Sequence, residues 1–232
     1  NEGLDYHLAS LVPSPKYLER CELVPAGDGF TLLYPSRRNP NELSPTSEYP
    51  KLLATFLQYG DWLEKLGISN VGALNNAIES GHGDEIVLVS EAFHEQRLAQ
   101  ISRQIADRID RSHVILVAGP SSAGKTTFSR RLTVQLLALG ISPFPLELDN
   151  YFLSRNETPL GEDGKPDFEA LEALDLALLA DHLQKLIHGD EVQLPRYNFK
   201  TGQREAGEVI RLARGQPIIL EGIHGMDPHL IP

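Results

Sequence analysis

The sequence contains one cysteine, Cys21, and no apolar run that approaches the length of about 18 residues required of a membrane-spanning helix. A single cysteine excludes an internal disulfide and a cysteine-rich zinc site, and it agrees with a reducing compartment. No signal-peptide pattern opens the chain. We therefore expect a cytoplasmic protein.

Positive charge is also scarce, because 21 lysines and arginines stand against 32 acidic residues and leave a formal net charge of −11. This charge repels a nucleic-acid backbone, and no local basic patch interrupts it. We expect no nucleic-acid partner and no membrane partner, while the sequence leaves a homo-oligomer open. The 232 residues suffice for one large domain or two small ones.

The N-terminal half combines a short β segment with helical patterns. Two β-like runs, residues 20–24 and 30–35, flank the turn sequence PAGDG and predict a small hairpin. Residues 47–110 are helical in pattern, and the apolar spacing from Leu98 to Ile109 is typical of a packing face rather than a cofactor site. The charged sequence RQIADRIDRSH marks a boundary, so we expect domains at residues 1–111 and 112–232.

Strands alternate with helices in the second half. Apolar runs at 113–118, 144–148 and 217–222 predict strands buried on both faces, and residues 125–140 and 175–189 predict amphipathic helices. Asp175 is the expected N-cap of the second helix, and Gly189 its stop. The alternation predicts an α/β fold with a doubly wound parallel sheet, preceded by a small α+β or helical module.

Two features predict that the chain is a fragment. It starts at Asn1 rather than at a methionine, and it stops soon after residues 217–222, which resemble a central strand. Because an α/β domain rarely ends there, we expect part of its machinery to lie outside this sequence.

The sequence GPSSAGKTT joins the first of these strands to the first helix. It satisfies the pattern G-x-x-x-x-G-K-[ST] of a phosphate-binding P-loop, also called Walker A, in the required strand and helix context. Glycines let backbone N–H groups surround a phosphate at a helix N-terminus, where the dipole favours an anion. Lys125 then bridges the terminal phosphates of ATP, and the Thr126 hydroxyl holds Mg²⁺. The expected nucleotide-binding residues are Gly119, Pro120, Ser121, Ser122, Ala123, Gly124, Lys125, Thr126 and Thr127.

Acidic residues end the other two strands, at the edge where open α/β sheets bind ligands. Asp149 is expected to accept the proton of an attacking hydroxyl and to help order the metal, with a turn cap as the alternative. Glu221 follows four apolar residues, so its carboxylate needs a partner, which we expect to be Mg²⁺. His224 lies just beyond, where contact with the phosphates and ordinary packing are both open.

Several stretches together resemble the uridine kinase and phosphoribulokinase family of P-loop kinases: GPSSAGKTTFSRRL, LELDNYF, PDFEALEALD, PRYNF and IILEGIHG, in that order. The resemblance implies transfer of the ATP γ-phosphate to a primary hydroxyl of a nucleoside or sugar, with Asp149 as catalytic base. It implies substrate-binding roles for Tyr151, in the aromatic stretch after that base, and for Glu169, at the place of a ribose-binding aspartate. Tyr197 stands at the place of a tyrosine beside the nucleobase.

One position departs from the uridine kinases, which carry a histidine that reads the pyrimidine where this sequence has Gly202. A missing donor in a recognition site lowers discrimination by orders of magnitude. The acceptor is therefore open, and Arg196, Lys200 and Arg204 leave room for an anionic one unless they are only solvated.

Residues 6–23 resemble the end of the second additional domain of threonyl-tRNA synthetases. His7 and Leu11 stand where that domain has zinc-binding cysteine and histidine residues, so we expect neither the metal site nor editing activity, and a structural module is the favoured interpretation. The alternative function is a nucleotide-sensing or translation-associated module that holds ATP without kinase turnover. Salt-dependent binding to tRNA would distinguish it from a kinase.

Overall fold

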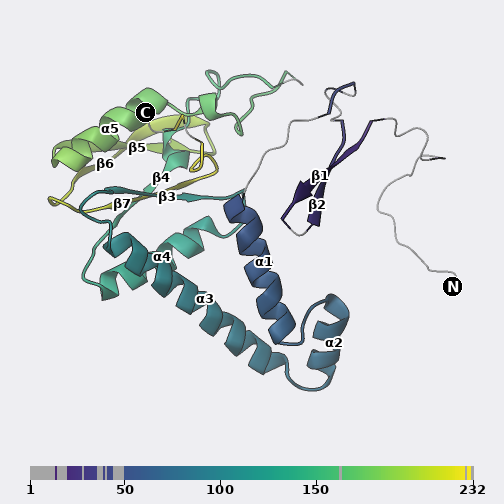
Figure 1. Cartoon of the computed structure of the whole chain (residues 1–232). Coiled ribbons are helices and arrows are strands. Elements are labelled where there is room, and N and C mark those ends of the chain that lie inside the picture. The colour runs from purple at the N-terminus through teal and green to yellow at the C-terminus, as the bar shows by residue number, and fades with distance from the viewer. Residues whose placement is uncertain are drawn as a thin grey trace. The chain divides into compact units, whose positions relative to one another are not determined.

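The computed structural model describes residues 14, 20–27, 29–35, 39, 41–43, 50–161, 164–227, 229 and 230. The chain divides into two compact units, Asn1–His82 and Gly83–Pro232 (Figure 1). His7 and Leu11, which carry the resemblance to a synthetase domain, lie outside the described residues.

The first unit contains the strands β1 (Glu22–Ala26) and β2 (Gly29–Leu33) and the helices α1 (Pro50–Lys65) and α2 (Val71–Glu79). The strands pair antiparallel, which confirms the predicted hairpin. Helix α2 begins after Asn70, whose side-chain oxygen accepts a hydrogen bond from the N–H of Ala73 at 2.9 Å. Asparagine is a preferred N-cap because its oxygen satisfies an N–H that the helix itself leaves without a partner.

The second unit begins with helix α3, and its elements follow in this order: α3 (Gly83–Ala106), β3 (Val114–Ala118), α4 (Lys125–Ala138), β4 (Phe144–Glu147), the 3₁₀ helices η2 (Leu148–Tyr151) and η3 (Leu171–Ala173), α5 (Leu176–His188), β5 (Glu191–Asn198), β6 (Gln203–Arg211) and β7 (Ile218–Gly222). Helix α3 packs on α4 through Leu98. The boundary between the two compact units therefore lies before α3, whereas the boundary expected from the sequence, between residues 111 and 112, lies after it.

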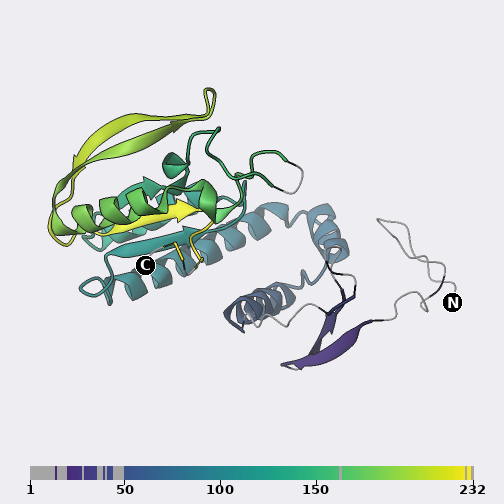
Figure 2. The same cartoon turned by 90° about the horizontal axis from the view of Figure 1, so that it is seen from above.

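A three-stranded parallel sheet in the order β3-β7-β4 forms the centre of this unit, with β7 in the middle as expected. Successive residues of β7 pack on opposite faces. Ile219 contacts the cluster of Leu98, Leu132 and Leu136 from α3 and α4, and Ile218 packs with leucines of α5. Figure 1 shows α5 on one side of the strands and α3 and α4 on the other, and Figure 2 shows α5 lying along β7.

Helices on both faces of a parallel sheet confirm the predicted doubly wound α/β fold. The predicted caps of α5 are also confirmed: the Asp175 carboxylate accepts from the N–H of Leu178 at 3.0 Å, and Gly189 ends the helix with a φ of 82°. In the described part of the chain, no helix combines the length and apolar character needed to cross a membrane.

The β5–β6 hairpin was not predicted from the sequence pattern. The two strands pair antiparallel, with a shift of register between Gln193 and Pro195. Proline has no N–H to donate to a ladder and is tolerated in strands mainly at edges and bulges, which obscures the alternating pattern of β5. The hairpin matters because it carries Tyr197 and the turn around Gly202.

Candidate active site

The P-loop connects the end of β3 to the start of α4. Ser122 and Gly124 have left-handed backbone conformations, with φ of 61° and 86°. Gly124 is the N-cap of α4 and has no side chain, so it leaves the N–H groups of the first helical turn without a side-chain cap. Residues Pro120 to Gly124 are exposed. The loop therefore offers backbone donors and the positive end of a helix dipole to an anion.

Lys125 folds back across this loop. Its Nζ donates to the carbonyl oxygen of Pro120 at 3.1 Å. A Cβ atom on Gly119 would lie 3.3 Å from Cγ of Lys125 and 3.6 Å from Cβ of Ala123. The glycine at 119 thus permits the close approach of the lysine side chain, which places the amine over the loop.

Glu221 lies beside the start of α4, next to Thr126, and both residues belong to the predicted metal site. Its Oε1 accepts a hydrogen bond from the Thr126 hydroxyl at 2.8 Å. Its Oε2 faces the hydroxyl of Ser129 at 3.4 Å, near the upper limit for such a bond. Sequence reasoning missed Ser129, although its spacing of three residues from Thr126 places both on one helix face.

Asp149 lies in η2, immediately after β4. Burial raises the pKa of its carboxyl above the usual value of 3.8, and the negative charge of Glu221 adds to the rise. The positive charge of Lys125 opposes that rise, and so does the neighbouring His224. These four side chains therefore interact at the carboxyl edge of the sheet, and a raised proton affinity is the property a general base needs.

Gly222 explains how η2 comes so close to β7. A Cβ at this position would lie 2.5 Å from Cδ1 and 2.6 Å from Cβ of Leu148, which is almost completely buried. Only a residue without a side chain lets η2 pack here and bring Asp149 toward Glu221.

We expect Gly222→Ala to lower the free energy of unfolding by about 1–3 kcal/mol, because the buried Leu148 cannot move aside without strain. Thermal or urea unfolding followed by circular dichroism measures this change. Gly60→Ala is the control, since a Cβ in the middle of α1 meets no atom within 4 Å and replaces a poor helix former. Equal stability of Gly222→Ala and the unaltered protein would contradict the packing described for Leu148.

The turn after β7 adds His224 to this site. A Cβ on Gly225 would lie 3.1 Å from Cβ of Ala118, so the turn packs against the end of β3 where the P-loop begins. Nε2 of His224 is buried and has no hydrogen-bond partner within the described residues. The sequence allows two roles for His224, contact with phosphates or ordinary packing. A buried imidazole nitrogen without a partner among the described residues favours the first.

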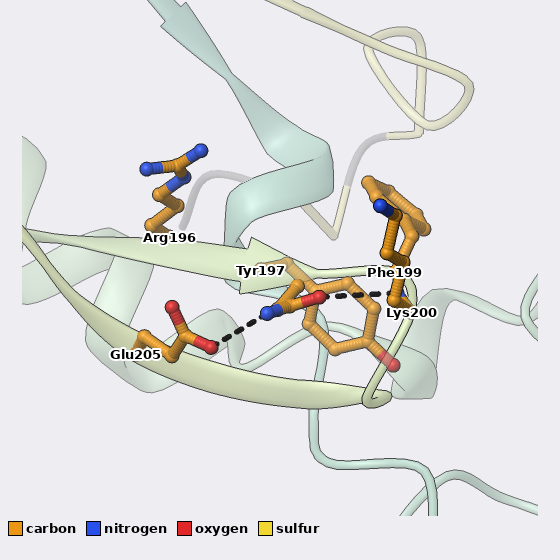
Figure 3. A pocket seen from close by; sticks show the side chains of 6 residues that line it. Arg196, Tyr197, Phe199, Lys200 and Glu205 are labelled. Atoms are coloured by element: carbon orange, nitrogen blue, oxygen red, sulfur yellow. Dashed lines mark hydrogen bonds between the residues drawn. The ribbon is translucent and has the colours of Figure 1, made fainter.

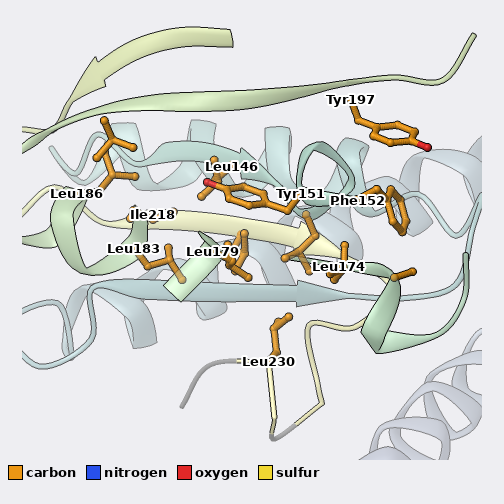
Figure 4. Packing of buried hydrophobic residues seen from close by; sticks show 14 of the residues in the cluster. Leu146, Tyr151, Phe152, Leu174, Leu179, Leu183, Leu186, Tyr197, Ile218 and Leu230 are labelled. Carbon is orange, nitrogen blue, oxygen red and sulfur yellow. The ribbon is translucent and has the colours of Figure 1, made fainter. Parts of the chain in front are cut away.

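The β5–β6 hairpin supplies a second, aromatic part of the site. Tyr197 is 5% exposed, and its ring packs edge-on against Phe152 at 5.6 Å and Phe199 at 5.0 Å between centroids. Its hydroxyl is buried and lacks a hydrogen-bond partner among the described residues. Figure 4 shows Tyr197 at the end of the hydrophobic cluster, with its hydroxyl pointing away from the buried leucines.

Asn150 links the two parts of the site. Its side-chain oxygen accepts a hydrogen bond from the backbone N–H of Tyr197 at 3.2 Å. Since Asn150 directly follows Asp149, this bond fixes β5 relative to the segment that carries the expected base. No local sequence signal marks Asn150, because the contact joins residues 47 positions apart.

A pocket of about 440 Å³ lies along the hairpin. Its lining residues are Arg196, Tyr197, Asn198, Phe199, Lys200 and Glu205, and Arg196 and Lys200 point upward in Figure 3. Arg204 does not line it, because its guanidinium pairs with the Asp175 carboxylate at 2.8 Å. Of the three basic residues considered for an anionic acceptor, the structure therefore leaves Arg196 and Lys200 at the pocket.

The two other expected substrate-binding residues differ in position. Tyr151 is fully buried, and its hydroxyl lies 3.2 Å from Nδ1 of His182, so the structure places it in the core rather than at the surface of the site. Burial raises the pKa of its phenol. Glu169 is exposed and follows Phe168, whose ring packs against Phe152. Glu169 therefore lies next to the packed rings of Phe152 and Phe168, whereas Tyr151 belongs to the buried core beneath the site.

A family model described as "Phosphoribulokinase / Uridine kinase family" matches residues 114–229. A uridine kinase of Halobacterium salinarum is 32% identical over 112 residues, which are 48% of this chain and 48% of that protein. A uridine kinase of Anoxybacillus flavithermus is 36% identical over 110 residues, or 47% of this chain and 51% of the relative. The chain thus spans about half the length of the curated relatives it matches.

Among solved structures, one described as a possible uridine kinase from Bacillus stearothermophilus aligns with a TM-score of 0.43 and 22% identity. The alignment covers 55% of this chain and 76% of the other.

Proposed function

Because the chain belongs to the phosphoribulokinase / uridine kinase family, we propose that it transfers the γ-phosphoryl group of ATP to a hydroxyl of a small molecule. The names of the curated relatives favour a nucleoside as acceptor, and a sugar is the other candidate. The observation that carries the proposal is the meeting of Lys125, Asp149 and Glu221 beside the P-loop.

The P-loop and Lys125 bind and position the phosphates. Backbone N–H groups at the start of α4 donate to phosphate oxygens, and the Lys125 amine exchanges the Pro120 carbonyl for the terminal phosphates. Phosphoryl transfer needs little covalent chemistry from the protein, so positioning and electrostatic stabilisation supply most of the rate enhancement.

The residues beside Lys125 fit a magnesium ion. Thr126, Asp149 and Glu221 offer hydroxyl and carboxylate oxygens, the hard donors that Mg²⁺ prefers together with water and phosphate. When bound, Mg²⁺ neutralises charge on the phosphate oxygens. Thr126 and Ser129 orient the Glu221 carboxylate toward that position through their hydroxyl groups.

Asp149 acts as the base. Its carboxylate accepts the proton of the acceptor hydroxyl while the hydroxyl oxygen attacks the γ-phosphorus of ATP. The new oxygen–phosphorus bond forms as the bond to the bridging β–γ oxygen breaks, and ADP leaves with the electron pair of that bond. The raised pKa of Asp149 strengthens it as a proton acceptor.

The aromatic part of the hairpin receives the acceptor. The Tyr197 hydroxyl lacks a partner among the described residues and is available to a ligand, and exposed Phe199 offers a ring face beside it. A nucleobase can stack on such a face. Glu169 is placed by the neighbouring Phe168 and is proposed to accept hydrogen bonds from sugar hydroxyls.

We expect Thr126→Val to lower kcat/KM for ATP by about 10–100-fold, since it removes the hydroxyl that holds Glu221 and offers an oxygen to Mg²⁺. Thr126→Ser keeps the hydroxyl and is the matched control, with activity close to that of the unaltered protein. Initial rates at varied Mg²⁺ and ATP measure both effects. Activity in Thr126→Val as high as in Thr126→Ser would contradict this role of the hydroxyl.

The test of the function is ATP consumption by the full-length protein with Mg²⁺ and a panel of nucleosides, ribose phosphates and pantothenate. We expect ADP release that depends on one acceptor class and on Asp149. If ADP release is the same with and without every acceptor, phosphoryl transfer to a small molecule is the wrong assignment.

A further inference from the structure

The hairpin turn at Gly202 is covered by a residue from a different segment, Arg155. A Cβ on Gly202 would lie 2.9 Å from Nε, 3.0 Å from Cβ and 3.1 Å from Cζ of Arg155. The arginine side chain therefore occupies the space into which any side chain at position 202 would project. Gly202 also has a φ of 68°, a conformation that glycine adopts without strain.

One backbone hydrogen bond holds Arg155 at this turn, and a second closes the turn itself. The N–H of Arg155 donates to the carbonyl oxygen of Gly202 at 2.9 Å, and the N–H of Gly202 donates to Asn198 at 2.7 Å. The same two segments also meet through the rings of Phe152 and Tyr197. The loop that carries Arg155 is thus fixed to the hairpin at two points, and the guanidinium lies against Gly202 at the turn of the hairpin.

Among the described residues, none accepts a hydrogen bond from the Arg155 side chain. Its guanidinium makes no hydrogen bond and no ion pair with any of the described residues, and the side chain is exposed. The buried hydroxyl of Tyr197, on strand β5 of the same hairpin, is likewise without a partner in the described part of the chain. A guanidinium on an anchored loop and a phenol of the same hairpin, both without partners among the described residues, are polar groups expected of a recognition site.

We infer that Arg155 determines acceptor specificity by donating hydrogen bonds to an oxygen-rich edge of the acceptor, from the space that a side chain at position 202 would fill. This inference rests on the proposed function. The group that Arg155 binds is a carbonyl or anionic oxygen of the acceptor. A nucleobase supplies a carbonyl oxygen, and a sugar phosphate supplies an anionic one.

The chemistry of the guanidinium decides which acceptors fit. Arginine has five N–H donors, carries its charge at all physiological pH values and has no acceptor. It therefore binds a carbonyl, carboxylate or phosphate oxygen and leaves an amino group without a partner. Among pyrimidine nucleosides, uridine presents a carbonyl where cytidine presents an amine, so Arg155 favours uridine. Arg196 and Lys200 add positive charge to the pocket on the same hairpin.

The test compares kcat/KM of the full-length protein for uridine, cytidine and ribose 5-phosphate. We expect Arg155→Ala to lower kcat/KM for the preferred acceptor by about tenfold or more, with little change in the KM for ATP. A nucleobase carbonyl as ligand predicts a fall in the uridine-to-cytidine ratio. An anionic ligand predicts loss with ribose 5-phosphate that Arg155→Lys partly restores.

Two further variants separate recognition from a structural role. Gly202→Ala places a methyl group against Arg155 and should reduce the same selectivity, but should have little further effect in the Arg155→Ala background. Arg214→Ala removes an exposed arginine from the loop before β7 and should leave the acceptor ratios unchanged. Circular dichroism of each variant verifies the fold.

The outcomes distinguish this inference from the function on which it rests. An unaltered protein that phosphorylates no acceptor contradicts the proposed function, and the role of Arg155 with it. An active protein whose Arg155→Ala variant keeps its acceptor ratios and its kcat/KM contradicts the role of Arg155 alone. Equal losses for all acceptors in Arg155→Ala would also overturn the inference, because a specificity residue must change their ratio.

Discussion

Replacing Asp149 with asparagine lowers kcat for phosphoryl transfer by about 10²–10⁴-fold, because the amide keeps the shape of the side chain but accepts no proton from the acceptor hydroxyl. Asp149 follows β4 directly and interacts with Lys125 and Glu221, where the attacking hydroxyl and the γ-phosphate meet in the proposed reaction. The KM for ATP should change by no more than about threefold, since the P-loop contacts remain.

The pH dependence gives an independent view of the same residue. Because burial raises the pKa of Asp149, the acid limb of kcat should have its midpoint above the usual aspartate value of 3.8, and activity should fall as pH decreases through it. Asn150 bonds to Tyr197 and not to the reacting atoms. We therefore expect Asn150→Ser to leave this midpoint unchanged.

Replacing Asp149 with asparagine should lower activity but should not lower the free energy of unfolding at neutral pH. A carboxyl whose folded pKa is raised is costly to ionise in the fold, so the penalty is present at neutral pH and is lost as pH falls through the folded pKa toward the unfolded value. Asp149→Asn should therefore be at least as stable as the unaltered protein at pH 7. A variant that is both inactive and clearly less stable at neutral pH would contradict this account of Asp149.

Replacing Lys125 with alanine lowers kcat/KM for ATP by about 100-fold or more, since it removes the cation that the loop holds over the phosphate position. Nζ already lies over the loop through its bond to the Pro120 carbonyl, and Gly119 leaves room for its side chain. Initial rates and equilibrium binding of ATP measure the loss, which should be visible in both because Lys125 contacts phosphates in the ground state and the transition state alike.

The matched control for Lys125 is Lys185→Ala. Lys185 pairs with Asp181 at 2.7 Å on the exposed surface of α5, and pairs of this kind contribute little to stability. Its replacement should leave kcat/KM unchanged. If Lys125→Ala retained the activity of this control, the P-loop would not serve the role assigned to it.

Local sequence patterns were sufficient to predict the strands of the sheet and the position of the P-loop. The apolar runs around Val117, Leu146 and Ile219 predict strands, and the structure buries these three residues. Burial on both faces, expected for all three strands, holds for β7 in the middle of the sheet, whereas β3 and β4 expose Leu116 and Glu147. The caps at Asp175 and Gly189 follow from residue types with strong positional preferences. Such signals lie within a few residues of the features they predict.

The rest of the site depends on contacts between distant segments, for which one sequence carries no local signal. Asn150 reaches Tyr197, and Arg155 covers Gly202. The aromatic stretch after Asp149 illustrates the same difficulty, because the sequence does not tell which ring faces the core. In the structure Tyr151 is buried against His182, whereas Phe152 contacts Tyr197.

The most direct measurement is the transfer of label from [γ-³²P]ATP to a nucleoside by the full-length protein and by its Asp149→Asn variant. The account predicts a labelled nucleoside monophosphate, formed one for one with ADP, and its near-complete loss in the variant. ATP that binds through Lys125 without transfer of label to any acceptor would contradict the kinase assignment and favour a nucleotide-sensing module.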